Sequence, residues 1–553
     1  MVVDSYGLPY YIQTLKTRHR LIGFRHDECG KIFFASKNRN YCPYCKKAAD
    51  TELREISLVR DGIIDSISIN REESAEKWIG NRAVGIVEID IDGEKVRIPT
   101  EFSDIVISNE APFLVQKWIK QRVDPTARIL DYNPTGAIYY GVKFQPVISN
   151  KKIQTPFLDK LIESDKPGIS SIGISLPRYR TTAEEIAQAY QLDPNYIKKG
   201  LGVDEVSVPA WDQDTGTFAI DAALDAMTRL PPEFIQTIGM IVVGSESKPY
   251  SVKPSATNVQ SFLGLEQDII CYDAEFACIA AGMQIKSAIA LINSGEIESA
   301  LIIGADVSQG SPGDPLDLDT GAGGACFVVS KYNVILEYIG MHTHVGDHPD
   351  FMRRAGCPYP VHGYGLTGEP SYFHFQEAAI EKTLKAYGIE LDQIKAATFH
   401  QPNYNFIMKE VKKLGLDLES RVKRELKPCI IGAPVRKIGN TYSAATMLGL
   451  AAIANEPEHY FEIDEATAQK VGFPDPKNPT LSLEPEDLVL TGWYGSGAAG
   501  GCILFKTTQN YPDYIGCTLP FSRRLTKSDV IGGNKYVSLL QRYFAKRNII
   551  NLK

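Results

Sequence analysis

The segment Tyr272-Asp-Ala-Glu-Phe-Ala-Cys278-Ile-Ala-Ala-Gly282 places a cysteine directly before a long apolar helical run that ends near Ser294. The dipole and the unpaired amide groups of a helix N-terminus favour the thiolate, and the thiolate is the strong nucleophile. A free cysteine is nevertheless among the most commonly buried residue types, so an inert core position is the ordinary interpretation of Cys278 taken alone. Its neighbours in the chain must decide between the two.

Two further residues carry the chemistry that a nucleophilic cysteine would need. Glu246 follows the apolar run Val242-Val-Gly, and His400 follows Thr398-Phe, as residues at strand ends do. A carboxylate and an imidazole can move protons during reactions at an acyl group. Each also has an ordinary interpretation, because a carboxylate after a strand is often a helix cap and a single histidine is often a hydrogen-bonded core residue.

From Gly168 the chain alternates strands and helices, which predicts an α/β domain, and the pattern repeats. Each half has four elements in the same order. In the first half they are a strand ending at Glu246, a helix starting at Cys278, the strand Ala300–Asp306 and the Gly-rich turn Thr320–Ser330; in the second half they are a strand ending at His400, a helix starting at Asn440, the strand Asp487–Thr491 and the Gly-rich turn Gly495–Phe505. Packing about a pseudo-twofold axis would bring Glu246, Cys278, His400 and Asn440 to one central site, although Asn440 after glycine is also a good N-cap.

The composition is that of a soluble globular protein with two or three domains, since 44% of the 553 residues are hydrophobic and 23% are charged. We find no apolar stretch that approaches the length of a membrane-spanning helix, and the N-terminus lacks a signal-peptide pattern. We therefore expect a cytoplasmic chain that does not enter a membrane. The 10 cysteines are scattered rather than spaced as a disulfide framework, and the net charge of −8 argues against a nucleic-acid partner.

The N-terminal fifty residues contain the pairs His26-Asp-Glu-Cys29 and Cys42-Pro-Tyr-Cys45. Two such knuckles predict one tetrahedral zinc site, and four protein ligands leave no position for water, so its role would be structural. In the alternative, His26 is a surface residue and the three cysteines bind metal weakly or not at all. The local excess of basic residues could face the phosphates of a nucleotide-bearing ligand, although a solvated surface is the commoner outcome.

Short β-rich runs from about Glu52 to Val147 predict a small all-β barrel. Such barrels and zinc ribbons often bind nucleic acids, but acidic and basic residues nearly balance over residues 1–150. We place the domain boundary in the polar stretch from Ser149 to Gly168. The expected domains are a zinc ribbon with an N-terminal helix (1–50), an oligonucleotide-binding (OB) type barrel (51–150), an α/β domain (167–510, with halves 167–335 and 336–510) and a C-terminal extension (511–553).

Residues Gly168 to Lys506 resemble the thiolase superfamily, and most closely the archaeal type of hydroxymethylglutaryl-CoA synthases. The N-terminal region resembles the DUF35 family, whose OB-fold proteins accompany thiolase-type enzymes. The motifs that carry the first resemblance are Gly244-Ser-Glu-Ser247, Phe276-Ala-Cys278, Asp350-Phe-Met-Arg-Arg354, Thr367-Gly-Glu-Pro370, His400-Gln-Pro-Asn403 and Tyr494-Gly-Ser-Gly497. The resemblance implies a duplicated fold with α/β/α/β/α layers and a condensing enzyme that forms carbon–carbon bonds.

The resemblance also implies a role for each site residue. Cys278 would accept the acyl group from acetyl-CoA, and Glu246 would remove a proton from the acetyl methyl group. His400 would polarise the ketone of the second acyl-CoA and protonate the alkoxide, while Asn440 would hold an acyl or ketone oxygen. Backbone amides at Cys278 and near Ser496 are suited to an oxyanion hole. Thr367 and Lys409 match positions that contact substrate or CoA.

Several positions depart from the family, which leaves the acyl substrates open. They are Ile279 where lysine is common, Asp319 and Gly321 where hydroxyl residues are usual, and Gly365 and Asn405 where basic CoA contacts are usual. There are two alternatives. One is a ketoacyl-synthase-III-like or C-acyltransferase enzyme, and the other is a scaffold that bridges an acetoacetyl-CoA thiolase and channels CoA thioesters. A homodimer or higher oligomer is expected from the resemblance. The histidines His342, His344 and His348 lack a convincing metal-ligand set.

Overall fold

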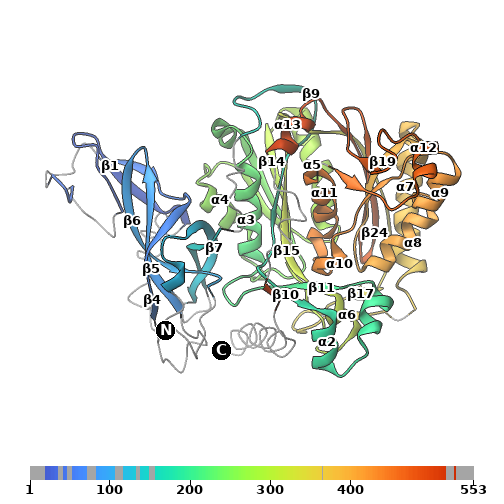
Figure 1. Cartoon of the computed structure of the whole chain (residues 1–553), viewed down its shortest axis with the longest axis horizontal. Coiled ribbons are helices and arrows are strands. Elements are labelled where there is room, and N and C mark those ends of the chain that lie inside the picture. Colours follow the sequence, from blue (N-terminus) through green and yellow to red (C-terminus); the bar gives the residue numbers. More distant parts are fainter. Residues whose placement is uncertain are drawn as a thin grey trace. The chain divides into compact units, whose positions relative to one another are not determined.

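The computed structural model describes residues 19–34, 42–45, 53–70, 82–105, 116–132, 137–147, 156–363, 365–456, 458–517 and 529–530. The expected N-terminal helix falls mostly outside these residues, as does most of the expected C-terminal extension. The chain forms two compact units, Met1–Lys151 with Ser261–Gly264, and Lys152–Gln260 with Leu265–Lys553. Each unit is coloured along the sequence in Figure 1.

The described part of the first unit consists mainly of β-strands. Strands β1 (Ile22–His26), β2 (Ile32–Phe34) and β3 (Leu53–Ser57) form an antiparallel sheet in the order β2-β1-β3. Strands β4 (Gly62–Asn70), β5 (Arg82–Ile91), β6 (Glu94–Phe102), β7 (Arg122–Tyr132) and β8 (Ile138–Pro146) close a barrel in the order β4-β5-β6-β8-β7. Alternate residues of these strands, such as Val96 and Ile98, face a common apolar core, because side chains alternate between the two faces of a strand. The predicted small all-β barrel is confirmed.

The second unit contains a 10-stranded sheet whose two halves repeat each other. The strands in order are β13 (Ile270–Ala274), β12 (Ile238–Gly244), β14 (Ser299–Val307), β15 (Ala322–Tyr332), β9 (Glu163–Ser175), β16 (Leu336–His348), β24 (Gly497–Thr507), β23 (Leu488–Gly495), β19 (Ile394–Thr398) and β20 (Ile430–Gly432). From either edge inward the pairings are parallel, parallel, antiparallel and antiparallel. The halves join where Leu336 and Glu337 of β16 pair with Ile169 and Gly168 of β9.

Helices complete the layers of this unit. The central helices α5 (Ala280–Ser294) and α11 (Ala445–Asn455) lie between the two half-sheets, while α3 (Thr215–Met227) and α7 (His374–Tyr387) cover the outer faces (Figure 1). Almost every residue of α11 is buried, as expected for a helix with a sheet on each side. The predicted duplicated fold with α/β/α/β/α layers is confirmed.

The two Gly-rich segments are strands rather than the turns that the sequence suggested. They form β15 and β24, and their small residues let a covering helix approach the sheet closely. A Cβ atom at Gly324 would lie 2.9 Å from the backbone oxygen of Phe218 in α3, and one at Gly500 would lie 1.9 Å from that of Phe375 in α7. The glycines therefore serve helix-on-sheet packing at equivalent places in the two halves.

Helix α5 corrects two expectations. The window Ala277–Ser294 is long and apolar enough to cross a membrane by length and composition, contrary to our prediction that no such stretch exists. Half of this window is buried inside the protein, where its Ile285 and Ile289 side chains join the main core. In addition, α5 begins at Ala280, so Cys278 precedes the helix by two residues.

The chain has further described elements after residue 152. They are β10 (Tyr179–Thr182), α2 (Ala183–Tyr190), η2 (Tyr196–Leu201), β11 (Glu205–Val208), η3 (Pro232–Thr237), α4 (Ala256–Leu263), α6 (Pro315–Asp319), β17 (Phe351–Met352), β18 (Val361–His362), η4 (Glu369–Phe373), η5 (Leu391–Gln393), α8 (Tyr404–Lys413), α9 (Leu418–Lys423), α10 (Val435–Ile438), η6 (Tyr442–Ala444), β21 (His459–Tyr460), α12 (Glu465–Lys470), β22 (Thr480–Leu481), α13 (Tyr511–Gly516) and β25 (Asp529–Val530). Strand β25 pairs in parallel with β10.

Candidate active site

Cys278 and Glu246 are in direct contact. Glu246 follows the end of β12 and Cys278 lies between β13 and α5, so the parallel pairing of β12 with β13 brings their ends together. The Cys278 thiol donates a hydrogen bond of 2.7 Å to Oε1 of Glu246. Cys278 is 6% exposed, whereas Glu246 is only partly buried. The carboxylate of Glu246 thus lies against the buried thiol, and Glu246 itself is partly accessible to solvent.

The surroundings keep this pair protonated rather than ionised. Burial, and next to it the charge of Asp306, raise the pKa of Glu246 to about 8. Burial and the adjacent Glu246 carboxylate raise the pKa of the Cys278 thiol well above its ordinary value. The expectation that a helix N-terminus favours a resting thiolate is therefore wrong, because desolvation and a like charge outweigh the dipole of a helix that starts two residues later.

Asp306, at the end of β14, organises the turn that carries Glu246. Its Oδ1 accepts hydrogen bonds from Glu246 N at 2.9 Å, from Ser247 N at 3.0 Å and from the hydroxyls of Ser245 and Ser247 at 2.8 and 2.7 Å. Its Oδ2 accepts from Ser443 N of η6 at 2.9 Å. Sequence reasoning did not identify this residue, although a carboxylate in an otherwise apolar, fully buried strand is a signal that could have found it.

His400 and Asn440 occupy the matching places in the second half. His400 is buried after β19, and burial lowers its pKa to about 3, so its imidazole is neutral. The Tyr372 hydroxyl donates a 2.6 Å hydrogen bond to the backbone oxygen of His400. Asn440 N donates to the backbone oxygen of Asp319 at 2.6 Å, and Asn440 Oδ1 accepts from Tyr442 N at 2.9 Å. This second bond leaves the Asn440 amide nitrogen as the group able to donate to a substrate oxygen.

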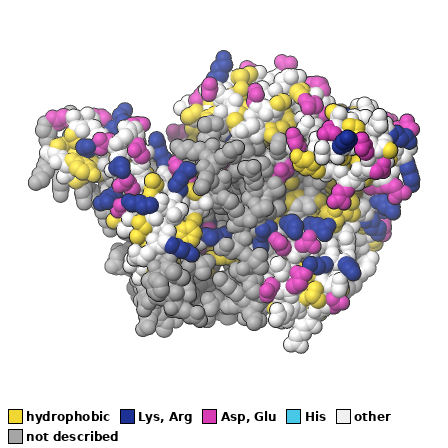
Figure 2. All heavy atoms as spheres, viewed as in Figure 1, with side chains coloured by type: hydrophobic (Ala, Val, Ile, Leu, Met, Phe, Trp, Pro, Cys, Tyr) yellow, Lys and Arg dark blue, Asp and Glu magenta, His cyan; other side chains and the backbone are white. Residues whose placement is uncertain are grey.

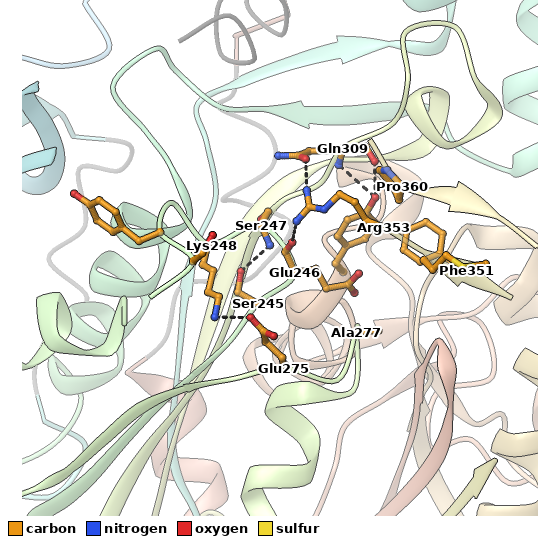
Figure 3. A pocket seen from close by; sticks show the side chains of 14 residues that line it. Ser245, Glu246, Ser247, Lys248, Glu275, Ala277, Gln309, Phe351, Arg353 and Pro360 are labelled. Atoms are coloured by element: carbon orange, nitrogen blue, oxygen red, sulfur yellow. Dashed lines mark hydrogen bonds and ion pairs between the residues drawn. The ribbon is translucent and has the colours of Figure 1, made fainter. Parts of the chain in front are cut away.

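The segment Asp350–Arg353, which contains β17, connects the two halves of the site. Asp350 accepts hydrogen bonds from the Tyr494 hydroxyl at 2.6 Å, from the Ser496 hydroxyl at 3.2 Å and from Gly497 N at 3.2 Å. The Arg353 guanidinium donates at 2.5 Å to the backbone oxygen of Glu246 (Figure 3). Because Gly497 N donates to Asp350, this amide is not directed at a substrate oxyanion.

A cavity of about 460 Å³ opens beside Glu246. Its lining comes from both halves of the repeat: Ser245, Glu246, Ser247, Lys248, Tyr250, Ser251, Glu275, Ala277, Gln309, Phe351, Met352, Arg353, Pro360 and Tyr442. Figure 3 shows Glu246 and Arg353 in its middle and the Lys248–Glu275 ion pair at one side. Glu246 and Ala277, the residue before Cys278, therefore border one space.

The residues expected to contact CoA are less clearly placed. Lys409 forms a 2.6 Å ion pair with Glu369 and lies 4.8 Å from the centre of the Phe373 ring, half-exposed on α8. Thr367 is partly buried in the bend before η4. At the position where the family usually has a basic residue, the Asn405 amide donates at 2.8 Å to each of the backbone oxygens of Lys199 and Gly200. The structure brings none of these residues into contact with Cys278 or Glu246.

The four predicted zinc ligands converge in the first unit. The ligand atoms of His26, Cys29, Cys42 and Cys45 all lie within 4.8 Å of one another. Nδ1 of His26 is 3.2 Å from Sγ of Cys29 and 3.5 Å from Sγ of Cys45. One imidazole and three thiols are the donors that tetrahedral zinc prefers, so these residues fit the ion.

Charges of both signs cover the visible surface. Figure 2 shows Lys and Arg side chains interspersed with Asp and Glu over the described part of this face. The ion pairs of the described residues include Lys413 with Glu377 at 2.6 Å and Arg436 with Asp204 at 2.8 Å. Among the described residues in this view, no broad region of a single sign stands out.

Known proteins resemble this chain in sequence and in fold. No family model matches it. The hydroxymethylglutaryl-CoA synthase of Methanopyrus kandleri is 38% identical over 349 residues, which cover 63% of this chain and 90% of that protein. The hydroxymethylglutaryl-CoA synthase of Pyrobaculum aerophilum is 34% identical over 389 residues, which cover 70% of this chain and 99% of that protein.

Solved structures agree at the level of the fold. A hydroxymethylglutaryl-CoA synthase complexed with CoA has a TM-score of 0.55 and 20% identity, and the match covers 68% of this chain and 90% of that one. The 3-oxoacyl-(acyl carrier protein) synthase III of Pseudomonas aeruginosa has a TM-score of 0.50 and 18% identity, covering 62% and 99%. At these identities the likeness is one of fold.

Proposed function

Because the chain belongs to the hydroxymethylglutaryl-CoA synthase family, we propose that it condenses acetyl-CoA with acetoacetyl-CoA or a related 3-ketoacyl-CoA through an acyl-Cys278 intermediate. The observation that carries the proposal is the 2.7 Å hydrogen bond from the Cys278 thiol to Glu246, since the carboxylate that we propose as the base lies beside the atom that would hold the acyl group. A carboxylate beside the acyl carbon is where proton removal from that group requires it.

In the first step, the Cys278 sulfur attacks the thioester carbonyl of acetyl-CoA. A carbon–sulfur bond to Cys278 forms, the bond to the CoA sulfur breaks, and the thiol proton leaves with CoA. With the thiol consumed, the Glu246 carboxylate faces the methyl group of the acetyl ester. A site pKa of about 8 makes this carboxylate a stronger base than an ordinary glutamate.

In the second step, Glu246 removes a methyl proton and the resulting enolate carbon attacks the ketone of the second substrate. The neutral His400 and the Asn440 amide hydrogen-bond to the ketone oxygen as it becomes an alkoxide. Because burial lowers the pKa of His400 to about 3, its neutral imidazole is a poor source of the proton that the resemblance assigned to it. Glu246, protonated by the methyl group, would return the proton to the alkoxide instead. Water then hydrolyses the thioester to Cys278, which releases the product with a free carboxylate and restores the thiol. The thioester to the CoA of the second substrate is kept.

Intact-mass measurement after incubation with isotope-labelled acetyl-CoA tests both steps. We expect an acetyl adduct that disappears in Cys278→Ser. In Glu246→Ala the adduct should still form while condensation is lost. Normal condensation by Glu246→Ala, or an adduct that survives Cys278→Ser, would contradict the proposal.

The residues that depart from the family pattern leave two alternative functions open, and the same assay distinguishes them. In a ketoacyl-synthase-III-like or C-acyltransferase enzyme Glu246 would be incidental, whereas in the structure it contacts the Cys278 thiol directly. A panel of acyl-CoA donors and acceptors identifies the preferred pair. A scaffold that channels thioesters from an acetoacetyl-CoA thiolase would give no adduct with any donor.

The remaining assignments are also proposals. Residues 1–50 would hold a structural zinc ion through His26, Cys29, Cys42 and Cys45, and residues 51–150 would form an OB-type barrel of the DUF35 kind. Residues 167–510 would carry the catalysis, with Thr367, Lys409 and Ser496 on the substrate side. We expect a cytoplasmic homodimer or higher oligomer.

A further inference from the structure

A buried glutamine, Gln309, belongs to the wall of the cavity beside Glu246. It follows β14 and is 2% exposed. The Tyr442 hydroxyl donates to its backbone oxygen at 2.7 Å, and its backbone N–H donates to the oxygen of that hydroxyl at 3.3 Å. The backbone of Gln309 is therefore fixed to η6 by two hydrogen bonds.

The Gln309 side chain uses one of its two polar groups. Its Oε1 accepts a hydrogen bond of 2.7 Å from the Arg353 guanidinium, and the facing atom must be the oxygen because arginine has no acceptor. Its Nε2 is buried and has no hydrogen-bond partner among the described residues. A buried amide nitrogen without a partner lowers stability, so packing alone does not explain a glutamine at this position. The bond to Arg353 is the contact that the side-chain oxygen supplies.

Arg353 is exposed, yet its guanidinium is bonded on two sides. Besides the bond to Gln309, it donates at 2.5 Å to the backbone oxygen of Glu246 (Figure 3). An exposed arginine side chain loses rotamer entropy when it is held in one geometry. The Gln309 oxygen offsets part of that loss, because it fixes the orientation of the planar guanidinium that bonds to the Glu246 turn.

The charged and titratable groups of the site and of the cavity wall come from several elements. They are Asp306 of β14, the Cys278 thiol before α5, Asp350 and Arg353 of the β17 segment, the Lys248–Glu275 ion pair, and the hydroxyls of Tyr250 and Tyr442. Burial and the two aspartates raise the pKa of Glu246, whereas the Cys278 hydrogen bond and the Arg353 charge lower it. Arg353 thus supplies a positive charge that favours the carboxylate form of Glu246.

We propose that Gln309 is a positioning residue that holds the Arg353 guanidinium against the turn of the proposed base, Glu246. The inference rests on the proposed function, in which Glu246 must be ionised to remove the methyl proton. Without the Gln309 oxygen, Arg353 keeps its bond to the Glu246 backbone alone, and its long side chain can turn toward solvent. The positive charge then spends less time beside Glu246, so a smaller fraction of the enzyme carries the ionised base at neutral pH.

The variant Gln309→Met tests the inference on the full chain, because methionine has a similar volume and no side-chain oxygen. We expect the acid limb of the condensation pH–rate profile to move up by about 0.5 to 1 pH unit, since a close opposite charge lowers the pKa of a carboxyl by about 1 to 3. The rate at pH 7 should fall about three- to tenfold and return to within about twofold of the wild type above the new limb. The melting temperature should stay near that of the wild type, because the substitution also removes the unpaired Nε2.

Two further variants connect the effect to Arg353. Arg353→Met should move the acid limb in the same direction by at least as much. Adding Gln309→Met to Arg353→Met should move it by no more than about 0.3 pH unit further, because both substitutions remove the same interaction. Arg354→Met is the matched control, since it removes the adjacent exposed arginine and leaves the bonds of Arg353 to Gln309 and Glu246 in place. This control should keep the wild-type profile.

The outcomes separate this inference from the proposed function. Absence of any acetyl adduct on wild-type Cys278 would overturn the proposed function and the inference with it. Normal acylation together with an unmoved acid limb in Gln309→Met would leave the function intact and overturn the inference. An equal loss of rate at every pH, with a lowered melting temperature, would show a structural role only and also overturn it. Additive shifts in the double variant would do the same, because Gln309 would then act on Glu246 without Arg353.

Discussion

The substitution Asp306→Asn should weaken the protein and shift the pH dependence of condensation together. Asparagine can keep its carbonyl oxygen where Oδ1 accepts its four hydrogen bonds, but its amide group then replaces Oδ2 and faces the N–H of Ser443. One charge-assisted hydrogen bond is lost and two donors oppose each other in a buried place. We expect a loss of about 2 to 4 kcal/mol in the free energy of unfolding.

The catalytic effect has a definite sign. Asp306 is the strongest charge among the influences that raise the pKa of Glu246. Removing that charge lowers the pKa of Glu246, so the carboxylate needed as base forms at a lower pH. The acid limb of condensation should move to lower pH, while the maximal rate falls by at least about tenfold because the Glu246 and Asn440 turns lose a shared anchor.

Urea unfolding and pH–rate profiles of the condensation measure these effects. Asp225→Asn is the matched control. Asp225 also accepts a partly buried backbone hydrogen bond, from Ile174 N at 2.8 Å, and it forms an ion pair with Arg229 at 2.9 Å. This control should lose stability and keep the wild-type profile. An Asp306→Asn enzyme within about 0.5 kcal/mol of the wild type, with an unmoved acid limb, would refute the reasoning.

Three other predictions follow from the described contacts. Alkylation of wild-type Cys278 by iodoacetamide should be slow at pH 7. At pH 8 it should be several-fold faster in Glu246→Gln than in the wild type, because the Glu246 charge raises the pKa of the thiol. An equal or slower rate in the variant would contradict this cause. Stability should fall as pH rises from about 4.5 to 8, since folded Glu410 binds a proton that the unfolded chain has released, and Glu410→Gln should remove on the order of 4 kcal/mol of that fall; an unchanged slope in urea titrations would count against it. Cys42→Ser should reduce bound zinc from about one ion per chain to almost none in elemental analysis, whereas Cys357→Ser, at an exposed cysteine of the second unit, should not; zinc retained in Cys42→Ser would exclude the site.

The sequence was sufficient for the duplicated fold because its two halves carry the same order of elements. Each half has its own strand-end polar residue and its own helix start, so the repeat itself predicted that Glu246 would lie near Cys278. The same pattern misjudged the Gly-rich segments, since glycine signals both a turn and a close helix–sheet contact, and only the packed helix distinguishes them. It also could not predict the state of the thiol, which depends on burial and on the charge of the adjacent Glu246.

Polar contacts between residues far apart in the sequence could not be predicted from it. Asp350 lies far in sequence from Tyr494, Ser496 and Gly497, to which it is hydrogen-bonded, and nothing in its immediate sequence distinguishes a buried carboxyl from a solvated one. Lys409 illustrates the reverse case, because its position in the motif suggested a ligand contact and the folded chain places Glu369 beside it. A motif identifies which residues are near a site, whereas the charges around each one decide what it does there.

The short segment Asp350–Arg353 imposes a condition on how this protein can vary. The two halves of the sheet repeat each other, and the two proposed steps need atoms from both halves to be positioned within a fraction of an ångström. Asp350 is bonded to the Ser496 turn and Arg353 to the Glu246 turn, so the length of this segment fixes the distance between the two turns. Substitutions elsewhere that change the spacing of the half-sheets would need a matching change in this segment. It should therefore tolerate fewer changes than the exposure of Met352 and Arg353 suggests.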